Sequence, residues 1–600
     1  MSTEDFIDAD SLAPPRTVKV DRGDGTFILR SPEPLKPYAR CIGEWVERWA
    51  AETPDAIAFA ERDPDGQWRR VSYRELRRLV GAIGQSLIDL DLPAEQPIVV
   101  LSDNAIDHAL LMLATMHVGR TICSVSSAYC RVAKDFGRIH GILRSLSPAL
   151  VYASDASVYG PPLASSGLRP VTVFSRGADK YPGALAFDHL TCTVERPAVM
   201  EAFDAIQPDD SAKYLLTSGS SGQPKLVINT HRMLCANQQM IAQVWHFLEL
   251  EKPIAVDWLP WSHTFGSNHN MNMILRNGGT MVIDEGRPLP GQVEKSVRNL
   301  CEIQPTLYFN VPRGFDMILP LLEQDESSAR DFFKRIRMVF YAGAALPQST
   351  WERLDALARR VRGRPIWFTT AWGSTETAPV ATNPHWWLER AGVVGLPLPG
   401  VELKFVPNGR KLEMRVRGVS VFPGYRNAPE KTAQAFDEEG FYCIGDAGFL
   451  VDENHPEKGI VFNGRVAEDF KLTSGTWVSV GTLRVKIVSA LAPLAQDVVI
   501  TGHDRAELGV LIFPSPQLKA LPVEEVASKV GAALHALRSE GGGSSQCPSR
   551  ALVLTEPPSI EAGEITDKGY INQRAVIDRR AADVETLYAT PCDPRVIALS

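Results

Sequence analysis

Apolar runs of strand length alternate with helical segments along much of this 600-residue chain. Residues 97–101 have the pattern of a strand, residues 104–117 that of a helix, and residues 121–125 that of a second strand. The same alternation returns around the strand-like segments 338–341 and 366–370. Strands that alternate with helices are typical of parallel sheets covered by helices. The sequence therefore predicts an α/β fold with substantially parallel sheets in layered subdomains.

The pattern changes after Pro399, where short strands and turns follow one another. This change predicts a β-rich subdomain that completes a large N-terminal domain, residues 1–464. Residues 465–600 are expected to form a small α+β C-terminal domain. The first residues, about 35 of them and rich in Pro, Asp and Gly, are expected to be an extended lead-in.

Charge and cysteine usage narrow the class of protein. The formal net charge is -8, whereas a nucleic-acid-binding domain usually carries a basic face. Nine cysteines occur without C-x-x-C spacing, which favours a reducing compartment over a disulfide framework. The N-terminus lacks an apolar signal core, and the apolar stretch 105–118 is too short to span a bilayer. We expect a cytoplasmic protein that binds neither nucleic acid nor membrane.

The most informative motif is a Ser/Gly-rich loop between two apolar runs. Its members are Thr217, Ser218, Gly219, Ser220, Ser221, Gly222, Gln223, Pro224 and Lys225. Hydroxyls and backbone N–H groups of such a loop can surround phosphate oxygens, and glycines allow close approach. Pro224 and Leu226 exclude a Walker A loop, and a strand is expected to follow. Taken alone, the segment is also compatible with a flexible hairpin turn.

This loop resembles the phosphate-binding loop of the adenylate-forming superfamily, which includes acyl-CoA synthetases, peptide-synthetase adenylation domains and beetle luciferases. Serines stand at 220 and 221 where threonines are more usual, and Leu226 replaces a glycine. The resemblance implies that the loop binds ATP, with Thr217 acting in catalysis and at a metal ion.

Further motifs in the family's order strengthen this resemblance. Residues 341–346 resemble the adenine-contacting turn, and residues 371–377 resemble the Y-G-x-T-E motif, with Trp372 in place of tyrosine to stack on adenine. By that match Glu376 would hold Mg²⁺, whose preferred ligands are carboxylate and phosphate oxygens. Asp446 and Arg465 would bind the ribose. The nucleotide residues implied by these segments are Gly343, Ala344, Ala345, Trp372, Gly373, Ser374, Thr375, Asp446 and Arg465.

The same resemblance implies roles for two lysines and identifies the position of an interdomain hinge. Lys568 matches the family's catalytic lysine, which lies near ATP and lowers repulsion between the attacking carboxylate and the α-phosphate. Lys471 is expected to assist thioester formation after the small domain rotates. Ala467 occupies the pivot position where Asp or Lys is common, which leaves no charged residue there for a hinge salt bridge.

Three segments indicate which residues bind the acid and which thiol accepts the acyl group. Residues 259–266 resemble the L-P-x-x-H segment of the acyl pocket, with His263 also assigned to catalysis. The acid-binding residues implied are His263, Thr264, Phe265, Asn310, Val311, Gly343 and Gly373. Alternatively, His263 is an ordinary core histidine. Gly541-Gly-Gly-Ser544 fits a phosphopantetheine attachment site but lies upstream of Lys568, so we expect a loop there and free coenzyme A as the acceptor.

The sequence is most similar to bacterial feruloyl-CoA synthetases, notably over residues 258–271, 369–374 and 563–574. This similarity implies hydroxycinnamates such as ferulate, p-coumarate or caffeate as substrates, in lignin-aromatic catabolism. A medium- or long-chain fatty acid and a benzoate are the alternative acids. A non-catalytic nucleotide-binding homologue is the alternative class, and a homodimer is left open.

Overall fold

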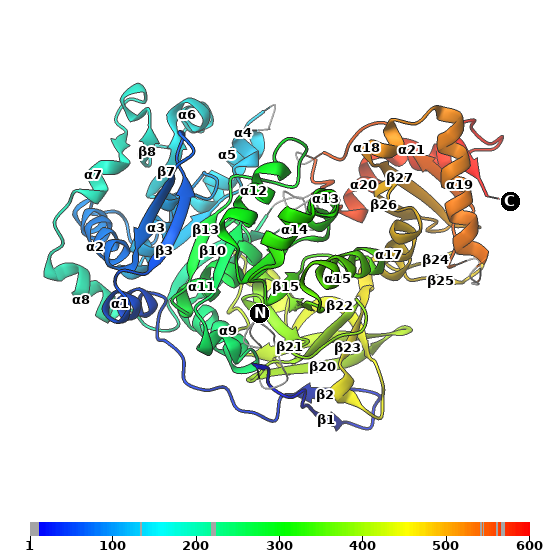
Figure 1. Ribbon diagram of the computed structural model, residues 1–600, viewed down its shortest axis with the longest axis horizontal. Coiled ribbons are helices and arrows are strands. Elements are labelled where there is room, and N and C mark those ends of the chain that lie inside the picture. Colours follow the sequence, from blue (N-terminus) through cyan, green and yellow to red (C-terminus); the bar gives the residue numbers. More distant parts are fainter. Residues whose placement is uncertain are drawn as a thin grey trace.

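Two sheets of mainly parallel strands lie at the centre of the large domain in the computed structural model, which describes residues 11–131, 135–217, 224–539, 543, 545–559, 562–565 and 571–599 (Figure 1). Their strand orders are β11-β10-β6-β5-β7-β8-β9 and β16-β15-β14-β12-β13-β3-β4. Only the outer strands β11 and β4 run antiparallel to their neighbours in these described sheets. The strands are β3 (Ile57–Arg62), β4 (Trp68–Ser72), β5 (Ile98–Val100), β6 (Ile122–Ser124), β7 (Leu150–Asp155), β8 (Val171–Arg176), β9 (Leu185–Ala186), β10 (Ser211–Thr217), β11 (Lys225–Thr230), β12 (Ile254–Asp257), β13 (Thr280–Ile283), β14 (Leu307–Asn310), β15 (Met338–Tyr341) and β16 (Trp367–Thr370).

Helices cover these sheets, and the central strands are accordingly buried along their whole length. Every residue of β5, β6, β14 and β15 is buried, as expected for parallel strands with helices on both faces. The main helices are α1 (Gly43–Glu52), α2 (Tyr73–Asp89), α3 (Ile106–His117), α5 (Gly137–Leu146), α6 (Ala156–Ala164), α8 (Pro197–Ala205), α9 (His231–Val244), α12 (Val293–Ile303), α13 (Pro312–Gln324), α14 (Glu326–Phe333) and α15 (Gln348–Arg362). The predicted α/β class is confirmed.

A nine-stranded antiparallel sheet forms the β-rich part of the described chain, in the order β1-β2-β20-β21-β22-β23-β19-β18-β17. Its strands are β1 (Val18–Asp21), β2 (Phe27–Arg30), β17 (Trp372–Gly373), β18 (Val380–Asn383), β19 (Val393–Pro397), β20 (Val401–Asn408), β21 (Lys411–Gly418), β22 (Tyr442–Leu450) and β23 (Ile460–Arg465). The expectation of an extended lead-in is wrong for residues 18–30. These residues form a hairpin that joins the sheet through β20, and Phe27 stacks on Phe405 with ring centroids 4.5 Å apart.

The small C-terminal part, drawn in orange and red at the right of Figure 1, is built on a four-stranded mixed sheet. Inward residues of its strands pack on α17 and α19 on one face, and on α20 and α21 on the other. The elements are α17 (Val480–Ala490), β26 (Ala495–Thr501), β27 (Gly509–Pro514), α19 (Val523–Ser539), β28 (Arg550–Val553), α20 (Gln573–Arg579), α21 (Ala581–Leu587) and β29 (Val596–Ala598). The predicted small α+β domain is thus confirmed.

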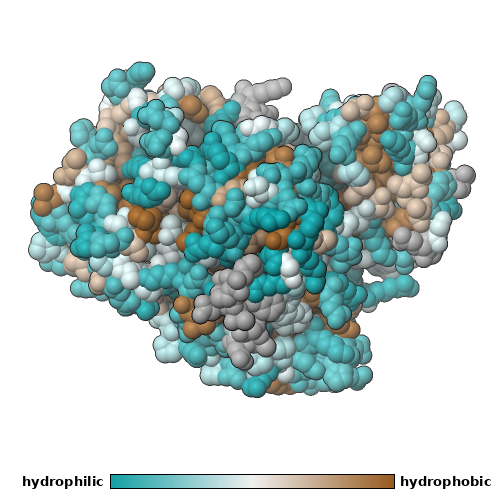
Figure 2. Space-filling view, in the orientation of Figure 1, coloured by the Kyte–Doolittle hydropathy of each residue, from teal (hydrophilic) through white to brown (hydrophobic). Residues whose placement is uncertain are grey.

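The face of the molecule shown in Figure 2 is mostly hydrophilic, with hydrophobic residues in small scattered groups. No helix in the described part of the chain is both long and apolar enough to cross a bilayer.

Candidate nucleotide and acid site

The Ser/Gly-rich loop connects two antiparallel strands, β10 and β11. Thr217 and Lys225 are the last residues paired before the loop begins. A strand therefore follows the loop, as predicted, so the loop does not lead directly into a helix. Ser218, Gly219, Ser220, Ser221 and Gly222 lie outside the described residues, and their assignment to phosphate remains a prediction.

Lys225 and Glu376 are joined through one tyrosine. The Lys225 Nζ lies 4.5 Å from the centroid of the Tyr425 ring, a cation–π contact. The Tyr425 hydroxyl donates a hydrogen bond of 3.0 Å to Glu376 Oε1. Tyr425 thus links the end of the loop to the carboxylate expected to bind metal. The sequence analysis missed this residue, because nothing in the local pattern distinguishes it from an ordinary core tyrosine.

The turn that carries Glu376 is tightly constrained. Gly373 has φ +154°, and a Cβ there would lie 1.9 Å from the Pro379 carbonyl oxygen, so only glycine fits. Thr375–Thr377 form the short helix η5, and Asn229 Nδ2 of β11 donates to the Thr375 carbonyl at 3.2 Å. The phosphate-loop hairpin and the Glu376 turn are therefore bonded to each other.

Glu376 is 6% exposed and one of its oxygens is already oriented by Tyr425. A buried, oriented carboxylate next to a loop that is predicted to bind phosphate fits a divalent cation that shares phosphate oxygens. Among the described residues there is no cluster of three or more His, Cys, Asp or Glu side chains able to hold a metal. The remaining ligands of such an ion would come from the nucleotide, from water and, by the same prediction, from Thr217 at the end of β10.

Three predicted nucleotide residues form a second cluster. Trp372 Nε1 donates to Asp446 Oδ2 at 2.8 Å, and Arg465 Nε lies 3.4 Å from Asp446 Oδ1. Asp446 and Arg465 are also paired across β22 and β23. Burial raises the pKa of Asp446, while the Arg465 charge and the Trp372 hydrogen bond oppose that rise. Oδ2 of this buried carboxylate thus accepts the Trp372 hydrogen bond, whereas Oδ1 is ion-paired with Arg465 but accepts no hydrogen bond from the described residues. Oδ1 is therefore suited to accept a hydroxyl hydrogen bond.

The predicted adenine turn follows β15 directly. Gly343, Ala344 and Ala345 are exposed, and Gly343 has φ +87°. The Ala342 N–H donates to the Asn310 carbonyl oxygen at 3.4 Å, which ties this turn to the end of β14. Small exposed residues leave the backbone accessible to a flat base.

Apart from Gly373 on β17, the predicted acid-binding residues lie at the ends of two neighbouring strands, β14 and β15, and in the segment after β12. His263 is half-buried, whereas Thr264 and Phe265 are 9% and 6% exposed. The Asn310 side chain is already occupied, because Nδ2 donates to the Tyr308 hydroxyl (2.6 Å) and Oδ1 accepts from the Val311 N–H (2.9 Å). Asn310 and the buried Val311 can therefore form a wall, but the Asn310 amide has little capacity left for a ligand.

Lys471 is exposed on the two-stranded unit β24 (Phe470–Lys471) and β25 (Trp477–Val478). Its Nζ lies 5.0 Å from the centroid of the Trp477 ring. Lys568 and its immediate neighbours 566–570 lie outside the described residues, as do 541, 542 and 544 of the Gly-Gly-x-Ser segment. The roles assigned to them therefore stay predictions.

Charged residues missed by the sequence analysis occur at the expected hinge. Lys411 Nζ lies 2.5 Å from Asp469 Oδ2, and both side chains are only 9% exposed. Asp469 Oδ1 also accepts from the N–H of Val480, at the start of α17. Ala467 at the pivot put a hinge salt bridge in doubt, and the structure places an ion pair beside that position. Asp469 lies two positions further along, and its partner comes from a distant strand.

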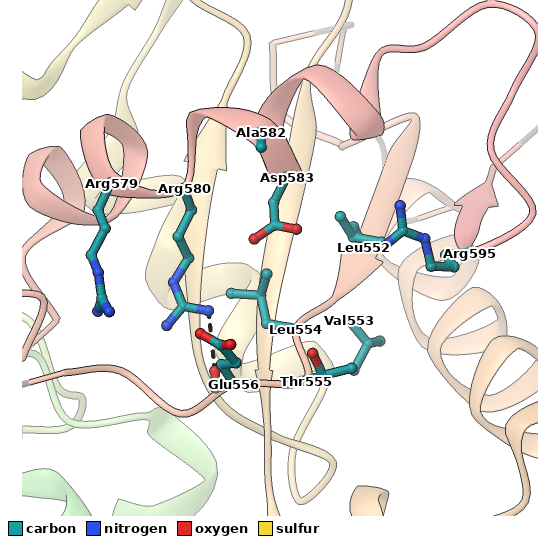
Figure 3. Close-up of a pocket in the computed structure, with 10 residues that line it drawn as sticks. All are labelled: Leu552, Val553, Leu554, Thr555, Glu556, Arg579, Arg580, Ala582, Asp583 and Arg595. Carbon is teal, nitrogen blue, oxygen red and sulfur yellow. Dashed lines mark hydrogen bonds between the residues drawn. The ribbon is translucent and has the colours of Figure 1, made fainter.

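A pocket of about 260 Å³ lies elsewhere, in the small domain (Figure 3). Its arginines are already paired: Arg580 donates to the Glu556 carbonyl and to Glu564, and Arg595 donates to Asp593. None of the predicted nucleotide residues that the structure describes lines it. The pocket is therefore a crevice beside an ion-pair network and is separate from the candidate site.

Comparison with known proteins places the chain in a family. Residues 46–426 match the model for AMP-binding enzymes, and residues 472–591 match the AMP-binding enzyme C-terminal domain. The chain therefore belongs to the AMP-binding enzyme family.

Several curated relatives are similar at moderate identity. A probable CoA ligase, CCL8, of Humulus lupulus is 26% identical over 57% of this chain and 57% of that protein. A carboxylic acid reductase of Segniliparus rugosus is 28% identical over 66% of this chain, but the match spans only 34% of that longer protein. The 4-coumarate–CoA ligase 2 of Oryza sativa subsp. japonica is 27% identical over 74% of this chain and 77% of that protein.

Solved structures share the fold. The anthranilate CoA ligase AuaEII in complex with anthranoyl-AMP superposes with a TM-score of 0.71 at 19% identity, over 92% of this chain and 98% of that one. The A-PCP didomain of the Segniliparus rugosus carboxylic acid reductase, in complex with AMP, gives a TM-score of 0.73 at 21% identity, over 93% and 83% of the two chains.

Proposed function

We propose that this protein is an ATP-dependent acid–CoA ligase that forms an acyl-adenylate and then an acyl-CoA. The observation that carries the proposal is the bonding of separated motifs into two adjoining clusters. One is the Lys225–Tyr425–Glu376 chain, and the other is the Trp372–Asp446–Arg465 cluster. Family membership and relatives that carry the name CoA ligase support the same reaction.

In the first half-reaction, a carboxylate oxygen of the acid attacks the α-phosphorus of ATP. The bond from that phosphorus to the bridging oxygen breaks, and diphosphate leaves. Lys225 would neutralise phosphate charge at the end of the loop, and Asp446 would hold the ribose hydroxyls. A cation fixed between the two reacting anions lowers the barrier, and Lys568 is assigned that role. Mg²⁺ bound at Glu376 would screen the phosphates.

In the second half-reaction, the thiol sulfur of coenzyme A attacks the acyl carbonyl carbon. The acyl–phosphate oxygen bond breaks, AMP leaves with that oxygen, and the thiol proton passes to solvent or to a basic group. No enzyme nucleophile is required, because the adenylate is already activated. Lys471, exposed beside Trp477, is assigned to this step.

For the acid, we propose a hydroxycinnamate such as ferulate, with a benzoate or a fatty acid as the alternatives. The similarity to feruloyl-CoA synthetases supports this choice, as does the relative named 4-coumarate–CoA ligase. Two assays test both the proposed reaction and the proposed acid: diphosphate release, and hydroxamate formation with hydroxylamine. Each is measured over a panel of acids with and without coenzyme A. Preference for an aliphatic acid would reject the hydroxycinnamate, and no acid-dependent diphosphate release would favour a non-catalytic homologue.

A further inference from the structure

A buried histidine lies inside a box of aromatic rings next to the predicted acid-binding residues. His269 belongs to the π-helix η4 (Phe265–Met271) and is 1% exposed. Its ring centroid lies 4.5 Å from that of Phe340, in a stacked arrangement, and 5.6 Å from that of Phe309. The Phe265 ring is 5.8 Å away and edge-on. π-Helical turns are frequent at functional sites.

The rings of this aromatic box belong to, or lie next to, the predicted acid-binding residues. Phe265 is itself a predicted acid-binding residue. Phe309 immediately precedes Asn310 on β14, and Phe340 lies on β15, three residues before Gly343 of the adenine turn. His269 is thus surrounded by rings from the three segments that the sequence analysis assigned to the acid.

A chain of hydrogen bonds fixes which nitrogen of His269 carries the proton. Asn270 Nδ2 donates to Asp257 Oδ2 at 2.8 Å, and this contact orients the Asn270 amide. Asn270 Oδ1 is therefore the acceptor in its 2.8 Å contact with His269 Nδ1, so Nδ1 bears the hydrogen. Burial lowers the pKa of His269 to about 4, and the ring is neutral near pH 7. His269 Nε2 is left as an acceptor only.

His269 Nε2 is fully buried and has no hydrogen-bond partner among the described residues. A buried polar atom without a hydrogen-bond partner is unfavourable, because it has lost its hydrogen bond to water. The three nearest rings are phenyl rings, which suit the faces and edges of an aromatic ligand but do not donate strong hydrogen bonds. The Trp245 indole lies 6.3 Å away, and its N–H already donates to Asn383. The group that this environment lacks is a single hydroxyl or N–H donor on an aromatic ring.

We propose that His269 Nε2 accepts a hydrogen bond from a ring hydroxyl of the acid substrate, and that His269 thereby selects hydroxylated aromatic acids. This inference rests on the proposed function, and it names the feature of the substrate that the site recognises. The Asp257–Asn270 pair acts as a positioning element, because it holds His269 in the tautomer in which Nε2 carries no hydrogen.

The wild-type protein tests the proposal first, with acids that differ only at one ring position. The panel is 4-hydroxycinnamate, cinnamate and 4-methoxycinnamate, each assayed by diphosphate release. We expect kcat/KM for the two acids without the hydroxyl to be about 10- to 100-fold lower, since a site built to bind a hydroxyl rejects analogues that lack it. Values within about twofold of each other would overturn the proposal.

Variants then assign the effect to this histidine. His269→Phe is expected to lower kcat/KM for 4-hydroxycinnamate at least about tenfold while leaving cinnamate unchanged or improved. His231→Phe is the matched control, because His231 is another buried histidine with a pKa lowered to about 4, but it lies at the start of α9 outside the box. It should preserve the preference for the hydroxylated acid.

The outcomes separate the two proposals. Activity with cinnamate but an unchanged hydroxyl preference in His269→Phe would overturn the role of His269 and leave the ligase function standing. Inactivity with every acid in the wild type would overturn the function itself. Should His269→Phe fail to fold by circular dichroism, Asn270→Leu removes the tautomer lock and is expected to reduce the preference; an intact preference would again reject the inference.

Discussion

The indole Nε1 of Trp372 donates a 2.8 Å hydrogen bond to Oδ2 of Asp446, a carboxylate that is only 7% exposed. The other oxygen, Oδ1, lies 3.4 Å from the Arg465 guanidinium. One of the two carboxylate oxygens expected to bind the ribose is therefore oriented by a tryptophan, at a position where the family usually has tyrosine.

Trp372→Phe is expected to raise the KM for ATP about 5- to 10-fold with a smaller change in kcat, because it removes one hydrogen bond to a charged group. Burial already raises the pKa of Asp446, and losing the donor raises it further. The ionised form is then lost at a higher pH on acidification, so the defect should grow as the pH falls. An equal KM for ATP in both proteins between pH 5 and 8 would contradict this account.

Tyr425→Phe keeps the ring beneath Lys225 but removes the hydroxyl that orients Glu376. We expect about a tenfold lower kcat and a several-fold higher Mg²⁺ concentration for half-maximal rate, since residues that orient a metal ligand typically affect metal affinity by 10- to 100-fold. Tyr214→Phe is the control, because the Tyr214 ring instead lies 4.8 Å from the Arg426 guanidinium. A Mg²⁺ dependence identical to wild type would show that Tyr425 does not position the carboxylate.

Sequence patterns predicted the elements of this fold better than the contacts between them. The β10–β11 hairpin follows from two apolar runs around a Ser/Gly loop, and β15 is predicted at its observed bounds. The Trp372–Asp446 bond joins residues 74 positions apart, and no local periodicity encodes it. The β1–β2 hairpin was missed because prolines and glycines surround two strands of four residues each.

The Lys411–Asp469 pair provides a test of the hinge region. Both side chains are largely buried, so Lys411→Met leaves a carboxylate without its partner and is expected to cost about 3 kcal/mol. Because Asp469 also accepts from the Val480 N–H, cleavage by a protease between residues 465 and 480 should accelerate. The double variant Lys411→Met/Asp469→Leu should recover part of the stability. Strictly additive losses would mean that the two residues do not interact.

Lys568→Ala is expected to lower the rate of adenylate formation by at least about a hundredfold, because fixed charge at the reacting phosphate contributes several kcal/mol. Thioester formation from supplied acyl-adenylate should change by less than about threefold, since that step needs no cation at the α-phosphate. Comparing the two half-reactions checks the assignment, with Lys529→Ala, on the exposed face of α19, as a control. Equal losses in both half-reactions would mean that another residue supplies the charge.

We expect the buried Lys213 to give the free energy of unfolding an unusual dependence on pH. This lysine of β10 is 2% exposed and donates to Ser267 Oγ at 2.7 Å, and the described residues show no ion pair to it. Burial lowers its pKa to about 7 from the ordinary lysine value of 10.5. Between these values the unfolded chain binds more protons than the folded one, so this residue makes stability rise with pH, at up to about 1.4 kcal/mol per pH unit.

Lys213→Met removes the buried charge while keeping much of the side-chain volume. We therefore expect a higher melting temperature than wild type at pH 7, and a difference that shrinks as the pH rises toward 10. Measuring both proteins over this range isolates Lys213, because the other titrating groups are common to both. A variant that melts lower than wild type at pH 7 would instead show that the Lys213–Ser267 hydrogen bond stabilises the fold by more than burial of the amine destabilises it.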